Sequence, residues 1–337
     1  MVTSGYATLA GFLAVVELAA AVWAVLVGAR SLWAANSGHD DAERLEARTY
    51  LAGLLAYLLL GASLLSWLVF YFMLDSFVSQ WKGAMCVYGV TQIGAGSYGI
   101  HRWLPRLVLL EQTLKPLLIF TTGAALVAYR YYRRQGTRTL LPHVALLLLL
   151  AAALAALDAA TELAYVAIPK RESLPNSGCC SAAAFSQEPP ARANPHEPRQ
   201  WTSAFYASQT LMVLLVLGAG AGGKASFLRR GWPLLLPAGM TLAIAMEFFV
   251  HVASPALLHL PYHHCIYDLV ARVPESAVAL SLLFAATCCV GWSAVVSGLA
   301  RREAPAEPSG EAHHWLAWSL LGYVGSTAMI SFNLWLA

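Results

Sequence analysis

Residues 140–157 read LLPHVALLLLLAAALAAL and contain no Asp, Glu, Lys or Arg. An α-helix needs about 20 consecutive apolar residues to cross the roughly 30 Å hydrocarbon core of a bilayer. Pro142 falls in the first turn of such a helix, where its missing N–H has no helical partner to lose. The run therefore predicts a helix that crosses a membrane.

The composition of the whole chain supports this interpretation. Of the 337 residues, 58% are hydrophobic and 12% are charged, whereas soluble domains contain about 25% charged residues. These figures exclude an ordinary soluble domain, a disordered chain and a collagen-like repeat. The net charge of +3 is small and dispersed. We therefore expect the lipid bilayer as a partner and no nucleic acid.

The same reasoning along the chain predicts an all-α polytopic membrane helix bundle of eight spans, forming a single transmembrane domain over residues 1–337. Three long loops bearing Cys and His are expected on the outer side. We find no repeat of the solenoid type, and an even number of spans in each half makes an inverted repeat awkward. The spans are expected near residues 7–35, 49–74, 107–129, 141–165, 204–222, 233–253, 275–298 and 314–336.

Lys and Arg in the connections between spans predict the orientation of the chain. The connections after the first, third, fifth and seventh spans are short and basic, so we place them in the cytoplasm. The chain is then expected to be a multi-pass protein of the cell inner membrane with both termini outside. These connections hold Arg44, Arg48, Arg130, Arg133, Arg134, Arg138, Lys224, Arg229, Arg230, Arg301 and Arg302.

Four of the six cysteines, Cys86, Cys179, Cys180 and Cys265, fall in the expected outer loops. Disulfides persist in an oxidising outer compartment. A bridge between the adjacent Cys179 and Cys180 would be strained. The less strained pairings join one of them to Cys86 and the other to Cys265, which would tie the three loops together. The remaining pair, Cys288-Cys289, lies within a span, and we interpret it as packing.

Two other interpretations of the outer cysteines stay open. In the first, His263, His264, Cys265 and Cys86 bind zinc or copper, because thiolate and imidazole are ligands of both metals. In the second, the vicinal pair Cys179-Cys180 passes electrons by thiol–disulfide exchange.

Ionisable residues inside spans are costly and indicate functional sites. Asp158 and Glu162 are four residues apart and so share one helix face, as do Glu247 and His251. Glu17 lies in the first span, and the third contains Glu111 and Lys115, which can neutralise each other. A proton path, a quinol-oxidising pocket or a cation site would each need such groups. The alternative is simple hydrogen bonding between helices.

These observations lead to three hypotheses. The first is a membrane redox protein or redox-complex subunit that handles electrons at the outer face, with a quinone or a transition metal as candidate cofactor. Whether the protein is an enzyme stays open. Its expected catalytic and proton-handling residues are Cys86, Cys179, Cys180, Cys265, Asp158, Glu162, Glu247 and His251.

The second hypothesis is a transporter of a small solute or metal ion that uses the same intramembrane carboxylates, with the cysteines as structural disulfides. The third is a non-catalytic membrane scaffold that docks a periplasmic or membrane partner protein. Its contact would be the polar, Pro-rich segment 188–199, which is expected to become ordered when the partner binds.

Overall fold

A computed structural model describes residues 4–37, 42–81, 84, 86–170, 197–221, 231–260, 263–303 and 310–337. The fold is all-α, as the sequence predicts. The chain divides into two compact units, which we call unit 1 (Met1–Ser177) and unit 2 (Gly178–Ala337). The expectation of a single transmembrane domain stays a prediction, because two bundles of one chain can belong to one membrane domain.

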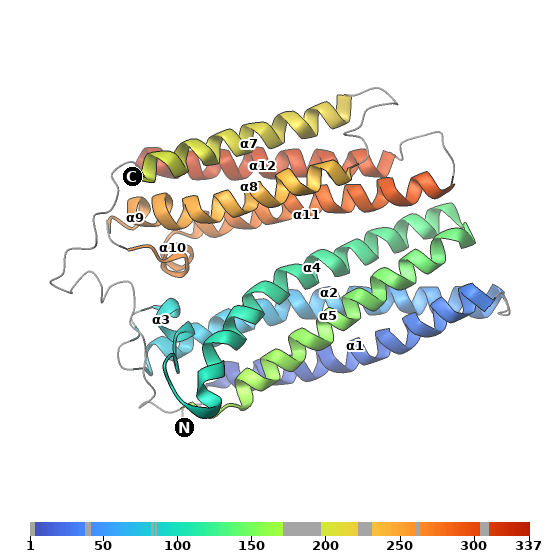
Figure 1. Cartoon of the computed structure of the whole chain (residues 1–337), viewed down its shortest axis with the longest axis horizontal. Helices are drawn as coiled ribbons and strands as arrows, with labels where there is room; N and C mark the ends of the chain where they lie inside the picture. The colour runs from blue at the N-terminus through green and yellow to red at the C-terminus, as the bar shows by residue number, and fades with distance from the viewer. Residues whose placement is uncertain are drawn as a thin grey trace. The chain divides into compact units, whose positions relative to one another are not determined.

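Unit 1 is built on four long helices, α1 (Gly5–Ser37), α2 (Ala42–Val78), α4 (Leu104–Gln135) and α5 (Leu141–Ala167). They run side by side (Figure 1), and each contacts the next in a closed ring, since α5 also packs on α1. Three short elements join them: α3 (Val87–Thr91), η1 (Gly99–Trp103) and η2 (Arg138–Leu140).

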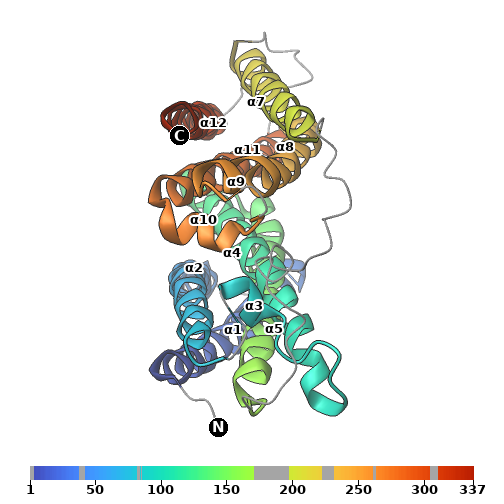
Figure 2. The same ribbon diagram turned by 90° about the vertical axis from the view of Figure 1, so that its left-hand side faces the viewer.

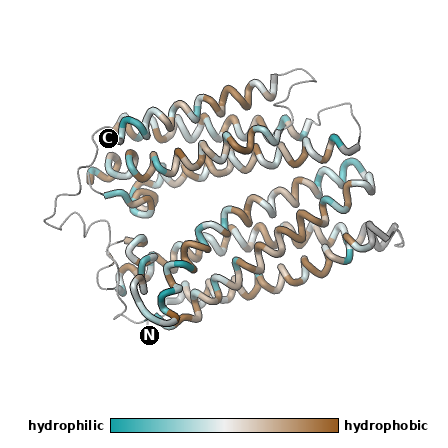
Figure 3. Tube along the Cα trace, viewed as in Figure 1, coloured by the Kyte–Doolittle hydropathy of each residue, from teal (hydrophilic) through white to brown (hydrophobic). Residues whose placement is uncertain are grey.

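The two ends of unit 1 differ in the elements and side chains that they carry. Figure 2 looks onto the end at which α3 lies against α2 and α4, and we call it the α3 end. The opposite end carries Arg130, Arg133 and Arg134 of α4, and we call it the basic end. Figure 3 shows hydrophobic residues along the middle of the long helices and hydrophilic ones near helix ends. This distribution suits a helix bundle that crosses a bilayer.

Unit 2 has the same plan. Its long helices are α7 (Glu197–Ala221), α8 (Leu235–Phe248), α11 (Pro274–Glu303) and α12 (Gly310–Leu336). These helices also contact one another in a closed ring, in the order α7, α8, α11, α12. The short elements are the 3-10 helix η4 (Trp232–Leu234), the π-helix η5 (Phe249–Ala253), α9 (Ser254–Leu257) and α10 (Ile266–Arg272).

The two units repeat one architecture. Cys86 stands eight residues after the end of α2 at Val78, and Cys265 stands eight residues after the end of α9 at Leu257. Each cysteine directly precedes a short helix, α3 or α10, and each begins a Cys-x-Tyr sequence. The repeat is direct in chain order, which fits the even number of long helices in each unit. The sequence analysis did not identify it.

Among the described residues, six helices are long and apolar enough to cross a membrane, so the protein is a multi-span helical membrane protein. The expected count of eight spans is not shown. Helices α4 and α12 have the length, but polar residues such as Glu111 and Lys115 in α4 lower their hydropathy. The six candidate spans are Gly5–Trp33, Ala47–Val78, Leu141–Ala167, Pro198–Gly220, Trp232–Leu257 and Pro274–Arg301.

Helix ends differ from the expected ones by several residues, because helices continue past the hydrocarbon core. Helix α7 begins at Glu197, so the last three residues of the proposed docking segment 188–199 belong to a helix. The rest of that segment lies outside the described residues. The scaffold hypothesis therefore stays a prediction.

The interiors of the two units differ in kind. A core of Ala and Leu side chains from α1, α2, α4 and α5 fills much of unit 1. Unit 2 has an aromatic core, in which the rings of Phe205 and Phe248 stack with their centroids 4.1 Å apart and Phe249 meets Phe248 edge-on. The two units thus share one helix arrangement but have different kinds of side chains in their cores.

Candidate functional site

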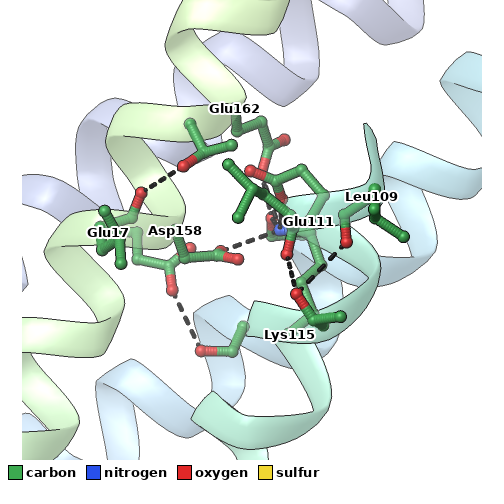
Figure 4. A network of polar contacts seen from close by, with 12 residues as sticks. Glu17, Leu109, Glu111, Lys115, Asp158 and Glu162 are labelled. Carbon is green, nitrogen blue, oxygen red and sulfur yellow. Dashed lines mark hydrogen bonds and ion pairs between the residues drawn. The ribbon is translucent and has the colours of Figure 1, made fainter. Parts of the chain in front are cut away.

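The most unusual group in unit 1 is a lysine that is completely buried. Lys115 of α4 has no exposed surface. Its Nζ lies 2.9 Å from Asp158 Oδ2, 2.8 Å from Glu162 Oε2 and 3.1 Å from Glu111 Oε2. Figure 4 shows these three carboxyl groups converging on the lysine nitrogen. One ammonium group is therefore in contact with three acids.

Two serines of α2 form hydrogen bonds in and beside this centre. Lys115 Nζ donates to Ser66 Oγ at 2.7 Å, and Ser66 in turn donates to Glu162 Oε2 at 2.6 Å. Ser63 donates to Oε1 of Glu17 at 3.1 Å. Glu17, on α1, is also completely buried. All four long helices of unit 1 thus contribute to one polar network, which we call the Lys115 cluster (Glu17, Ser63, Ser66, Glu111, Lys115, Asp158 and Glu162).

Helical spacing explains how the sequence builds this cluster. Residues four apart lie on one helix face, which places Asp158 and Glu162 together on α5 and Glu111 beside Lys115 on α4. The expected neutralisation of Glu111 by Lys115 is confirmed by their 3.1 Å ion pair. The participation of Ser63 and Ser66 was not predicted. Their spacing of three residues on one face of a span was the available signal.

The cluster contains more acids than bases. Four carboxyl groups, those of Glu17, Glu111, Asp158 and Glu162, accompany one ammonium group, and none has exposed surface. Ligand oxygens of Glu111, Asp158 and Glu162 lie within 4.8 Å of one another. Five carboxyl oxygens of these four acids accept no hydrogen bond from the described residues: Glu17 Oε2, Glu111 Oε1, Glu111 Oε2, Asp158 Oδ1 and Glu162 Oε1. Such a set can take up protons or a cation.

The cluster lies nearer to the α3 end than to the basic end. Glu162 stands five residues before the end of α5, and Glu17 stands twelve residues after the start of α1. At a rise of 1.5 Å per residue, these positions are about 8 Å and about 18 Å from the α3 end. On the other side, apolar residues such as Leu59 and Leu148 fill the bundle. An apolar core therefore separates the cluster from the basic end.

Unit 2 shows that this architecture does not require buried charge. Among the described residues of unit 2, no Asp, Glu, Lys or Arg is buried. Among its interior polar contacts is a neutral one between the hydroxyl groups of Thr287 and Tyr323, which lie 3.3 Å apart. Buried charges are costly in a membrane and are kept where they serve a function. The Lys115 cluster is therefore a candidate functional site.

A second buried lysine lies at the α3 end, beyond the last residue of α5. Lys170 Nζ donates to the carbonyl oxygens of Tyr165 at 2.6 Å and Ile168 at 3.2 Å, and lies 4.2 Å from the centre of the Tyr165 ring. Burial lowers the pKa of Lys170 from its ordinary value of 10.5 to about 8. The side chain caps carbonyl groups at the end of the helix.

The predicted cysteine site is only partly described. Cys86 lies buried in unit 1 and Cys265 lies buried in unit 2. No disulfide joins any of the described cysteines to another. Cys179 and Cys180 lie outside the described residues, and each expected pairing contains one of them. The disulfide pairings therefore stay predictions. Cys288 and Cys289 are buried in α11, where packing was expected.

The predicted metal ligands of unit 2 have separate partners. The Nε2 atom of His263 lies 2.7 Å from Asp268 Oδ2, whereas Nδ1 of His264 lies 3.1 Å from the carbonyl oxygen of Val250. Sequence reasoning did not single out Asp268, which follows Cys265 by three residues at the start of α10. Binding of one metal by His263, His264, Cys265 and Cys86 stays a prediction.

The predicted proton-handling residues fall into two groups. Asp158 and Glu162 belong to the Lys115 cluster in unit 1. Glu247 and His251 form their own ion pair in unit 2, with Oε2 and Nε2 3.2 Å apart. Comparisons with protein-family models, with curated proteins and with solved structures find no match for this chain.

Proposed function

We propose that the protein is a proton-coupled membrane transporter in which the Lys115 cluster binds and releases the coupling protons. We further propose that all eight long helices, α4 and α12 included, span the cell inner membrane. In this arrangement the basic connections face the cytoplasm and both termini lie outside, as the positive-inside rule favours.

The observation that carries this proposal is the excess of acids in the cluster. With all groups ionised, the four carboxylates and one ammonium group would leave a buried net charge of −3. A buried net charge of this size is energetically unfavourable inside a bilayer. The cluster must therefore hold protons or a cation, and losing them would force it to rearrange. A site with this property can couple proton binding to a change in the bundle.

The position of the cluster supports the same function. A coupling proton would enter from the α3 end, because the apolar core around Leu59 and Leu148 closes the way to the basic end. Passage to the cytoplasm would then require this core to open, as alternating access demands. A site with access from one side at a time would let a proton cross only when the bundle changes between its two states.

Proton movement in proteoliposomes tests the proposal. Purified protein is reconstituted with a pH-sensitive dye inside, and a potassium gradient with valinomycin drives protons inward. We expect uptake by the wild-type protein and its loss in Asp158→Asn and Glu17→Gln. Asp75→Asn is a matched control, because Asp75 lies in α2 but is exposed. Equal proton flux in the wild-type protein and Asp158→Asn would reject the proposal.

A second candidate function is thiol redox chemistry at the outer face, with a quinone or a transition metal as cofactor. Cys86 and Cys265 occupy corresponding positions in the two repeated units, and this correspondence supports the redox function. The test is alkylation of the purified protein before and after reduction, followed by mass spectrometry. Two results together would exclude this function. The outer cysteines would resist mild reductants, and the Cys86→Ser and Cys265→Ser variants would change only the stability of the protein.

A further inference from the structure

Several polar side chains gather around the π-helix η5 in unit 2. This element, Phe249–Ala253, continues α8 and has His251 at its centre. A π-helical turn is rare and occurs often at functional sites, because it shifts side chains and carbonyl groups out of the regular α-helical positions. The feature is independent of the Lys115 cluster, which lies in unit 1.

His251 is held on two sides. Its Nε2 atom lies 3.2 Å from Oε2 of Glu247, one helical turn earlier. The ring of Trp201, from α7, stacks on the imidazole with centroids 6.1 Å apart and an angle of 12° between the planes. The side chains of His251 and Glu247 are 32% and 50% exposed. Both side chains therefore have surface that neighbouring groups of the bundle do not cover.

His264 adds a second imidazole beside the first. The rings of His251 and His264 have their centroids 5.4 Å apart. Nδ1 of His264 lies 3.1 Å from the carbonyl oxygen of Val250, within η5. A carbonyl oxygen only accepts hydrogen bonds, so Nδ1 carries a proton, and in the neutral imidazole Nε2 has the free lone pair. Metal-binding histidines are commonly oriented by such a bond from the other ring nitrogen.

From this arrangement we propose that Glu247, His251 and His264 form a binding site for a divalent transition-metal ion. Two imidazoles and one carboxylate are a ligand set for Zn²⁺ and related ions, with the remaining coordination positions left for water or a further ligand. Metal binding by this set requires the Glu247 and His251 side chains to rotate toward Nε2 of His264. The neighbouring His263 is bonded to Asp268 and stays outside this ligand set.

Zn²⁺ and Co²⁺ are the probes for the test, with full-length protein from which any histidine tag has been removed. The protein is stripped with a chelator, loaded with Zn²⁺, desalted and assayed for bound metal. We expect about one Zn²⁺ per chain, as for other sites with three protein ligands. Co²⁺ should then give the absorption spectrum of a site with nitrogen and oxygen ligands and without thiolate.

Substitutions identify the ligands. We expect His251→Gln, His264→Gln and Glu247→Gln each to weaken Zn²⁺ binding by more than about tenfold, a loss seen even for residues that only orient metal ligands. His314→Gln is a matched control, because His314 is also exposed and contacts a tryptophan, Trp318. That variant should bind Zn²⁺ as the wild type does. Gel filtration checks that each variant is folded.

Two results would overturn the proposal. One is wild-type protein that retains no Zn²⁺ after desalting. The other is loss of Zn²⁺ in His263→Gln or Cys265→Ser while folded His251→Gln keeps it, because the metal would then be bound by His263 or Cys265 and not by the proposed ligands.

Discussion

Lys115 and Glu162 belong to different helices, α4 and α5, yet their Nζ and Oε2 atoms lie 2.8 Å apart and neither side chain is appreciably exposed. A buried ion pair is not strong evidence of stabilisation, because desolvation offsets much of the attraction. Removing one partner alone, however, leaves an uncompensated buried charge. This asymmetry gives the first prediction.

Lys115→Met should destabilise the protein by about 3–5 kcal/mol, because the buried carboxyl groups lose their only ammonium partner in the cluster. Thermal unfolding in detergent, followed by size-exclusion chromatography, measures the effect. Adding Glu162→Gln to Lys115→Met should recover part of the loss by removing one unpaired charge. Arg106→Met, at an exposed position on the same helix, is the control and should change little. A Lys115→Met variant as stable as this control would contradict the prediction.

Ser66→Ala should destabilise the protein by about 1–3 kcal/mol, because both Lys115 Nζ and Glu162 Oε2 lose a hydrogen-bond partner in a buried site. Thr161→Val is the control, since the buried Thr161 hydroxyl donates only within its own helix, to the carbonyl oxygen of Leu157. Unfolding temperatures of the two variants are compared in the same detergent. A larger loss in Thr161→Val than in Ser66→Ala would show that the bridging role of Ser66 is wrong.

Gly53→Ala should destabilise unit 1, because a Cβ at this position in α2 would overlap the ring of Tyr129 in α4. The ring and the glycine backbone meet where the two helices approach closely, as small residues permit in membranes. Gly61→Ala is the matched control, since nothing lies within 4 Å of a Cβ built there on the same helix. The unfolding temperature of Gly61→Ala should match that of the wild type. A second substitution, Tyr129→Leu, should partly relieve the Gly53→Ala defect.

The sequence was informative wherever one helix determined the geometry. The spacing of Asp158 and Glu162 predicted a shared face, and that of Glu111 and Lys115 predicted an ion pair, because both depend only on the helical period. Which helices lie next to each other depends on packing throughout the bundle. For this reason the approach of α5 to α4, which brings Asp158 to Lys115, could not be predicted.

The division of the chain into two units also could not be predicted by considering one span at a time. Glu247 and His251 have the same spacing as Asp158 and Glu162, and nothing within a single span distinguishes the two pairs. They belong to different bundles. Apart from Cys-x-Tyr at Cys86 and Cys265, the repeat carries no obvious sequence signal, because lipid-facing and core-facing positions accept many apolar residues.

Lys170 should make the stability of the protein depend on pH in the alkaline range. Its pKa is about 8 in the folded protein, below the ordinary value of 10.5, because burial disfavours the charged form. Below about pH 8 the amine binds a proton in both the folded and the unfolded chain. Between about 8 and 10.5 the unfolded chain holds a proton that the folded chain has lost, so stability rises with pH in this window.

The difference between the two pKa values corresponds to about 3 kcal/mol. Unfolding of the wild type and of Lys170→Met, measured from about pH 7 to about pH 10, isolates this contribution, because other titrating groups act equally on both proteins. The wild type should gain stability relative to Lys170→Met as the pH rises. If the two proteins differ in free energy of unfolding by the same amount at every pH, Lys170 titrates alike in the folded and unfolded chains. Burial at the end of α5 would then not disfavour its charge.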